Sequence, residues 1–252
     1  MYKIPANSLF VGHKIVFVPE CHSTNSEAIL LTDDNSIGDG TVVVTNNQLS
    51  GRGQRGNVWN AQPGKNLTFS IILKPSFLGA QSQFLLNIVI SLALHDFLLD
   101  HGVPSPKIKW PNDILVDGKK ISGILIENQV KGNKITNSII GVGLNINQES
   151  FPYSSATSLK SITNAEYDLS ASLIKVLEKI EARYLVLRSG NQKLLVENYE
   201  SHMFWRGEQH SFFANEKNFQ GVIKGLARGG QLEIETENGL MNFGIKEVKY
   251  IS

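Results

Sequence analysis

The stretch from Gln81 to Asp100 constrains the fold of this chain more than any other feature of the sequence. Its residues are mostly apolar, and the pattern ends at His101-Gly102, which is a typical helix stop signal. The sequence therefore predicts one long apolar helix here. The most apolar part, residues 84–94, contains Asn87 and Ser91 and is shorter than the ~20 residues that span a bilayer. We therefore expect a soluble, cytoplasmic protein with no membrane partner.

Composition supports an ordinary globular chain. The 252 residues are 41% hydrophobic and 19% charged, with a formal net charge of +1, so no overall basic excess points to nucleic acid. The opening residues 1–5 lack the apolar core of a signal peptide. The single cysteine, Cys21, excludes an internal disulfide and a cysteine-based zinc site. A half-buried thiol explains Cys21 better than a nucleophile, because no supporting pattern of His and Asn accompanies it.

Strand patterns surround the apolar helix. Short β-branched runs cover residues 14–18 and 41–44, and residues 67–73 alternate as a strand does. Asp117-Gly118 predicts a hairpin turn between the two apolar arms of residues 114–127. A second turn around Gly132 leads into a predicted strand over residues 138–146.

The residue pattern changes twice in the last third of the chain. Apolar residues recur at helical spacing over residues 169–187, and a second short helix is predicted over residues 192–200. After Trp205 the sequence becomes short strands separated by glycine turns, which favours a small antiparallel barrel. We therefore expect two units, residues 1–200 and 201–252.

Residues 51–56 read Gly-Arg-Gly-Gln-Arg-Gly. The glycines let backbone N–H groups approach a ligand, and the two arginines offer planar charged forks for carboxylate or phosphate. A flexible, solvated turn explains the same composition. The chain contains no Walker pattern, and Gly141-Val142-Gly143 lacks the third glycine of a dinucleotide fingerprint.

Two shorter stretches carry similar alternatives. Lys109, at the end of a strand-like run and before Trp-Pro-Asn-Asp, is either a rigidly held functional cation or an ordinary surface lysine. Residues 23–27 predict a helix start in which Thr24 and Glu27 form a capping box. A helix N-terminus favours anions, although capping alone accounts for the pattern.

Together and in this order, these stretches resemble the biotin–protein ligases, also called biotin–[acetyl-CoA-carboxylase] ligases. The likeness runs from about residue 14 to the C-terminus. It rests on Ser23-Thr24-Asn25, Gln48, Gly51 to Gly56, Trp59, Asn66-Leu67, Lys109-Trp110-Pro111-Asn112-Asp113, Gly118 to Glu127 and Gly141 to Asn145. The Lys-Trp-Pro-Asn-Asp run is the most specific of these motifs.

The resemblance implies an α/β (α+β) fold, with a mixed-sheet catalytic domain of the biotin/lipoate ligase type followed by an SH3-like β-barrel. It also implies an activity: biotin and ATP form biotinyl-5′-AMP and pyrophosphate, and a lysine of a biotin carboxyl carrier protein then takes the biotin. Biotin and ATP would be substrates, with Mg²⁺ on the ATP phosphates and its protein ligands unknown. The first step joins two anions, so the site must neutralise both.

The resemblance also assigns roles to individual residues. Lys109 and Arg52 would be the catalytic groups. The biotin site would comprise Ser23, Thr24, Asn25, Gln48, Gly51, Arg52, Gly53, Lys109 and Gly123. The ATP or adenylate site would comprise Arg52, Gln54, Arg55, Trp59, Asn112, Lys120 and Asn145.

Two departures from the family pattern bear on function. Many relatives carry arginine where this chain has Gln54, and that arginine is linked to retention of the adenylate. The chain also begins almost directly at the catalytic domain, so we expect the monofunctional type without a DNA-binding domain and no DNA partner. A loop over residues 47–57 is expected to close on the ligand, and homodimerisation, common among relatives, stays open. Lipoate–protein ligases and a catalytically inactive binding module are the rival interpretations.

Overall fold

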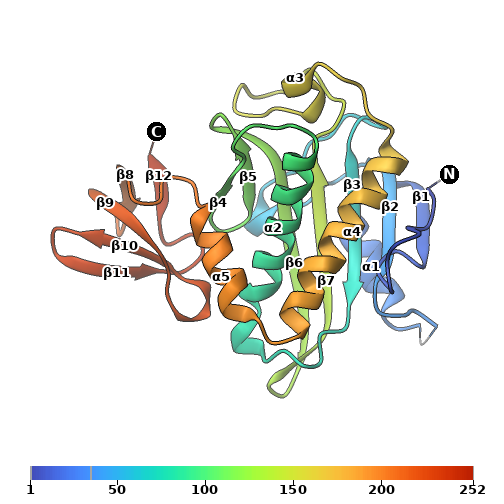
Figure 1. The fold of residues 1–252 in the computed structure, drawn as a ribbon, viewed down its shortest axis with the longest axis horizontal. Helices are drawn as coiled ribbons and strands as arrows, with labels where there is room; N and C mark the ends of the chain where they lie inside the picture. Colours follow the sequence, from blue (N-terminus) through green and yellow to red (C-terminus); the bar gives the residue numbers. More distant parts are fainter. Residues whose placement is uncertain (1, 35, 252) are drawn as a thin grey trace.

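The computed structural model describes residues 2–34 and 36–251, apart from the side chain of Arg55. The chain forms a seven-stranded mixed sheet followed by a five-stranded antiparallel sheet (Figure 1). This confirms the predicted α/β class and the antiparallel C-terminal unit. The predicted boundary at residue 200 stays a prediction, because the hydrophobic core is continuous across it and joins, for example, Tyr199 to Phe212.

The large sheet has the order β1-β2-β3-β7-β6-β5-β4. β1 and β2 are parallel, and the other neighbours are antiparallel. Its strands are β1 (Ile15–Cys21), β2 (Thr41–Gln48), β3 (Leu67–Leu73), β4 (Lys107–Lys109), β5 (Asp113–Val116), β6 (Lys119–Lys131) and β7 (Lys134–Leu144).

Helices cover both faces of this sheet. One face carries α2 (Phe84–Asp100), α4 (Leu169–Arg188) and α5 (Gln192–Ser201), while α1 (Thr24–Leu31) lies on the other (Figure 1). Because the sheet is covered twice, every residue of β3 is buried. The remaining helical segments are α3 (Leu159–Thr163) and the short η1 (Gln54–Gly56), η2 (Ala80–Ser82) and η3 (Arg228–Gly230).

The apolar helix is longer than its most apolar part suggested. Together with η2, the helical segment Ala80–Asp100 has 21 residues and is long and apolar enough to cross a membrane. In the fold, 72% of its most apolar window is buried. A helix that is hydrophobic all round belongs in the core of a protein or in a membrane, and here α2 is packed between the sheet and α4.

The C-terminal sheet has the order β11-β10-β9-β8-β12. Its strands are β8 (Gln209–Ala214), β9 (Lys217–Leu226), β10 (Leu232–Thr236), β11 (Gly239–Phe243) and β12 (Lys249–Ile251). The sheet is tied to the rest of the molecule by polar contacts. The Trp110 indole donates to the Gly230 carbonyl at 2.9 Å, and the Leu226 amide donates to Glu200 at 2.8 Å.

The predicted capping box at the start of α1 is wrong. The N-cap residue is Ser23, and its side chain makes no capping hydrogen bond. The Thr24 hydroxyl instead donates to Gln48 on β2 at 3.2 Å. The Thr24 hydroxyl therefore bonds to a residue on a distant strand and not to the end of its own helix.

Candidate active site

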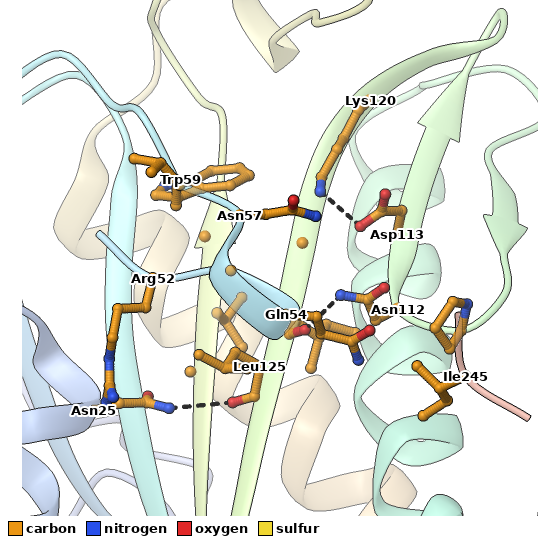
Figure 2. A pocket seen from close by; sticks show the side chains of 18 of the residues that line it. Asn25, Arg52, Gln54, Asn57, Trp59, Asn112, Asp113, Lys120, Leu125 and Ile245 are labelled. Atoms are coloured by element: carbon orange, nitrogen blue, oxygen red, sulfur yellow. Dashed lines mark hydrogen bonds and ion pairs between the residues drawn. The ribbon is translucent and has the colours of Figure 1, made fainter. Parts of the chain in front are cut away.

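A cavity of about 220 Å³ lies above β6 and β7 (Figure 2). It is bounded by the N-terminus of α1, by the loop over residues 52–59, by the segment before and in β5, and by the C-terminal residues 245–250. Segments far apart in the sequence therefore meet around one space, which is the usual setting of a ligand site.

One end of the cavity, called the neutral end below, is lined mainly by uncharged polar side chains and lies next to the Arg52–Glu127 ion pair. The amide and hydroxyl of Thr24 both donate to the side-chain oxygen of Gln48, at 2.8 and 3.2 Å. The Ser70 hydroxyl lies 2.7 Å from Thr24 Oγ1 and 2.6 Å from Asn25 Oδ1. Thr24, Asn25 and Ser70 are all buried. This end therefore presents fixed donors and acceptors to a polar, uncharged group.

The opposite end is charged. Lys120 Nζ lies 2.6 Å from Asp113 Oδ1 and 5.7 Å from the centre of the Trp59 ring. Figure 2 shows this pair across the cavity from Asn25 and Arg52. An amine beside an aromatic face suits the phosphate and base of a nucleotide.

Two glycines of β7 make room for the side chains at these ends. A Cβ at Gly141 would lie 2.4 Å from the Asn25 side-chain oxygen, and a Cβ at Gly143 would lie 2.2 Å from the Trp59 ring. Both distances are too short for a real contact, so any residue larger than glycine at position 141 or 143 would force its neighbour to shift. The Gly-Val-Gly run is therefore the floor of the cavity rather than part of a dinucleotide fingerprint.

Lys109 lies beside the cavity rather than in its wall. Its Nζ is 4.8 Å from the centre of the Tyr250 ring, and Tyr250 lines the cavity. Burial lowers the pKa of Lys109, and the positive charge of Lys120 lowers it further, while Asp113 opposes the shift. Lys120, in contrast, contributes directly to the cavity wall.

Most of the predicted site residues meet here. Those that line the cavity are Ser23, Thr24, Asn25, Gln48, Arg52, Gly53, Gln54, Trp59, Asn112, Lys120 and Gly123. Gly51 lies in the same loop and faces a neighbouring groove. The amide of Asn145 donates to the Thr157 carbonyl at 2.9 Å, just outside the cavity. The predicted contact of Arg55 concerns a side chain outside the described residues.

The sequence analysis missed an entire side of the cavity. Ile245, Lys246, Val248 and Tyr250 line it, although they follow the catalytic motifs by more than 100 residues. No local pattern around them indicates a site. Asp113, Trp110 and Pro111 also line it, and these lie inside the Lys-Trp-Pro-Asn-Asp motif that already pointed to function.

Comparison with known proteins agrees with this geometry. Residues 19–145 match the model of the biotin/lipoate A/B protein ligase family. The bifunctional ligase/repressor BirA of Bacillus subtilis is 30% identical over 235 residues, covering 91% of this chain and 72% of that protein. The biotin–[acetyl-CoA-carboxylase] ligase of Paracoccus denitrificans is 36% identical over 126 residues, covering 49% and 51%.

Solved structures extend the similarity to the whole fold. The biotin protein ligase of Aquifex aeolicus in complex with biotin and ATP superposes with a TM-score of 0.79 at 28% identity. The match covers 95% of this chain and all of that one. The chain therefore belongs to the biotin/lipoate A/B protein ligase family and is a ligase of the biotin protein ligase type.

Proposed function

We propose that this protein condenses biotin with ATP to biotinyl-5′-AMP and transfers the biotin to one lysine of a biotin carboxyl carrier protein domain. The observation that carries the proposal is the two-ended cavity. Thr24, Asn25 and Gln48 place uncharged polar groups in the wall at one end, where Ser70 holds the first two by hydrogen bonds. Lys120 offers a charge to an anion at the other end. Biotin has a polar uncharged ureido ring at one end and a carboxylate at the other.

The chemistry requires an anion to attack an anion. A carboxylate oxygen of biotin attacks the α-phosphorus of ATP, the bond from that phosphorus to the bridging oxygen breaks, and pyrophosphate leaves. The neutral lysine amine of the carrier then attacks the acyl carbon, AMP departs with the C–O bonding electrons, and the amine loses a proton. Fixed cations lower the barrier of the first step by offsetting the repulsion between the two anions.

Lys120 is our first candidate for that cation. Its amine is part of the cavity wall, pairs with Asp113 at 2.6 Å and lies 5.7 Å from the centre of the Trp59 ring. Lys109 is not part of the described cavity wall, although its Nζ lies 4.8 Å from the centre of the Tyr250 ring and the charges of Asp113 and Lys120 act on it. We therefore propose Lys120 as the first contact of the reacting anions and Lys109 as a second cation beside it; the catalytic role predicted for Lys109 stays a prediction.

Mg²⁺ is proposed to arrive with ATP. Among residues 2–34 and 36–251, no cluster of three or more His, Cys, Asp or Glu side chains is placed to hold a metal ion. Asp113 is the acidic side chain of the described cavity wall, and Lys120 already pairs with it. Phosphate oxygens would then supply most ligands, as Mg²⁺ in nucleotide sites prefers.

The relatives support the choice of substrates. The Aquifex protein is described in complex with biotin and ATP, and the Paracoccus protein is named for acetyl-CoA carboxylase as acceptor. A carboxylase carrier domain is therefore the acceptor that we propose here. Monomer or dimer, the absence of a DNA partner and a cytoplasmic location all stay predictions.

The decisive experiment mixes the purified protein with biotin, Mg-ATP and a biotin carrier domain and follows the mass of the carrier. One biotin on one lysine is expected, together with biotin-dependent ATP–pyrophosphate exchange. Exchange that responds to lipoate and ignores biotin would instead identify a lipoate ligase. Biotin binding without exchange or transfer would identify an inactive binding module.

A further inference from the structure

The loop over the cavity is tied to the sheet by an ion pair that the proposed reaction does not use. Arg52 Nη2 lies 3.1 Å from Glu127 Oε2, so this pair joins the loop to β6. The side chains are 44% and 34% exposed, so water reaches the pair. The charge of Arg52 is thus already matched by a carboxylate in the ligand-free protein.

The same carboxylate oxygen holds a second element. Asn25 Nδ2 donates to Glu127 Oε2 at 2.7 Å and to the Leu125 carbonyl at 3.3 Å. Asn25 stands in the first turn of α1 and belongs to the neutral end of the cavity. Glu127 therefore connects the loop, helix α1 and strand β6 at one point.

The loop that carries Arg52 is held together by its own backbone hydrogen bonds. Residues 51–59 form a small hairpin in which the Trp59 amide donates to the Gly51 carbonyl at 2.9 Å. The Gly53 amide donates to the Asn57 carbonyl at 2.7 Å, and Arg52 and Val58 form a bridge. Fixing Arg52 therefore fixes Trp59, which covers the charged end.

The direction of Arg52 separates it from the anion end. In Figure 2 its side chain points toward Asn25, across the cavity from Lys120 and Asp113. The charge of Arg52 is therefore matched by Glu127 and not by the Lys120–Asp113 pair.

We propose that Glu127 is a positioning residue that holds the 51–59 hairpin closed over the cavity through Arg52, and that Arg52 acts through this contact on retention of the acyl adenylate. The inference rests on the proposed function, since it concerns the intermediate of that reaction. It assigns Glu127, the last residue of the Gly118–Glu127 motif but not one of the predicted site residues, to the control of how long the reactive intermediate stays bound.

A double-mutant cycle with Glu127→Gln, Arg52→Gln and the double variant tests the proposal. Enzyme loaded with biotinyl-5′-AMP is chased with excess unlabelled biotin and ATP, and loss of the bound intermediate is timed. Partly exposed ion pairs contribute small energies, so each single variant is expected to release the adenylate about fivefold faster. The double variant should release it no faster than the single variants, because residues that act through one contact are not additive.

Steady-state exchange kinetics separate positioning from catalysis. The kcat for ATP–pyrophosphate exchange should fall much less in Arg52→Gln than the retention time does, with the main effect in KM and release. Glu127→Asp should restore part of the retention, because it keeps the charge. A kcat loss of about 100-fold in Arg52→Gln with no effect of Glu127→Gln would overturn the proposal and make Arg52 a direct contact of the anion.

Glu20→Gln is the matched control. Glu20 Oε2 accepts from Asn47 Nδ2 at 2.7 Å, so it is also a glutamate bound to an asparagine, and it lies on β1 away from the cavity. Unchanged retention is expected there. Limited proteolysis of the ligand-free protein adds a readout that needs no activity: Glu127→Gln should speed cleavage within residues 51–59, and Glu20→Gln should not. Faster cleavage with no adenylate formed by the wild type would reject the proposed function and retain the tether; equal cleavage in all variants would reject the tether.

Discussion

The two ends of the cavity are built by different physical means. At the neutral end, Thr24, Asn25 and Ser70 are buried and hydrogen-bonded to one another. At the charged end, Lys120 and Asp113 are 36% and 25% exposed in their side chains and are held by a single ion pair. Buried networks are costly to leave incomplete, whereas partly exposed charges exchange partners easily.

The difference explains how one cavity can select a ligand at one end and carry reactive charges at the other. The neutral end is preorganised, so it rejects a ligand that cannot satisfy its donors and acceptors. At the charged end, Asp113 compensates Lys120, and under the proposed function phosphate would replace it as the partner of Lys120. Substitutions at the two ends should therefore have separate effects on biotin and ATP, and the largest effect is expected at Lys120.

Lys120→Ala should break the charged end. Because the amine faces the cavity, its loss should lower the rate of ATP–pyrophosphate exchange by about 100- to 1,000-fold while biotin binding changes much less. Exchange kinetics and biotin calorimetry measure the two effects. Lys119→Ala is the control, since Lys119 is an exposed neighbour. If Lys109→Ala caused the larger loss of exchange, the order of the two lysines proposed here would be wrong.

Gly141 and Gly143 lie on the same strand, β7, and substituting each with alanine should disturb a different end of the cavity. The new methyl at position 143 would collide with the Trp59 ring, and the one at position 141 would collide with Asn25. We expect Gly143→Ala to raise the KM for ATP about tenfold and Gly141→Ala to weaken biotin binding to a similar degree, because overpacking typically costs about 1–3 kcal/mol. Gly38→Ala, with nothing near its Cβ, is the control. Equal effects of the two variants on both substrates would contradict the two-ended description.

Ser70→Ala should weaken biotin binding at the neutral end. The variant leaves Thr24 and Asn25 without the shared hydroxyl, and an unmet buried partner costs roughly 1–3 kcal/mol. We expect biotin to bind about tenfold more weakly in calorimetry, with little change in the KM for ATP. Ser138→Ala removes another fully buried hydroxyl, one that makes no hydrogen bond within the described residues, so it should leave biotin affinity intact.

The smallest functional effect is expected far from both ends, at Asp96 on α2. Burial alone would raise the pKa of Asp96, but His95 and the Arg183 guanidinium, 2.7 Å away, lower it to about 2. A lowered carboxyl pKa stabilises the fold above the ordinary value of 3.8 and loses that effect as the pH falls toward 2. Asp96→Asn should therefore cost about 1–2 kcal/mol of unfolding free energy at pH 7 and much less at pH 2, where about half of the native Asp96 is protonated.

Urea unfolding at several pH values measures this effect, and biotin transfer should be unchanged. Asp100→Asn, which breaks a more exposed pair with Lys179 on the same two helices, is the control and should cost less. A constant difference between wild type and Asp96→Asn from pH 7 to pH 2 would show that charge is not the cause.

Local patterns predicted most elements of the large sheet and its helices. The strand predicted over residues 67–73 coincides with β3, and Asp117-Gly118 forms the β5–β6 turn with both residues at positive φ. The start of α1 could not be predicted as well. Ser23 and Thr24 both suit a cap, and only the position of Gln48 on β2 decides that the Thr24 hydroxyl is used elsewhere.

The α/β class, the long core helix, the family and most residues of the cavity wall could be predicted from the sequence. These features follow from strand patterns, helix periodicity and short motifs, which are local properties of a chain. The packing of the whole chain places Lys120 in the cavity wall and Lys109 beside the Tyr250 ring. It also joins Arg52 to Asn25 through Glu127 and brings residues 245–250 to one side of the cavity. These relations join segments up to about two hundred residues apart, and side-chain direction across such distances follows from packing, which no local pattern encodes.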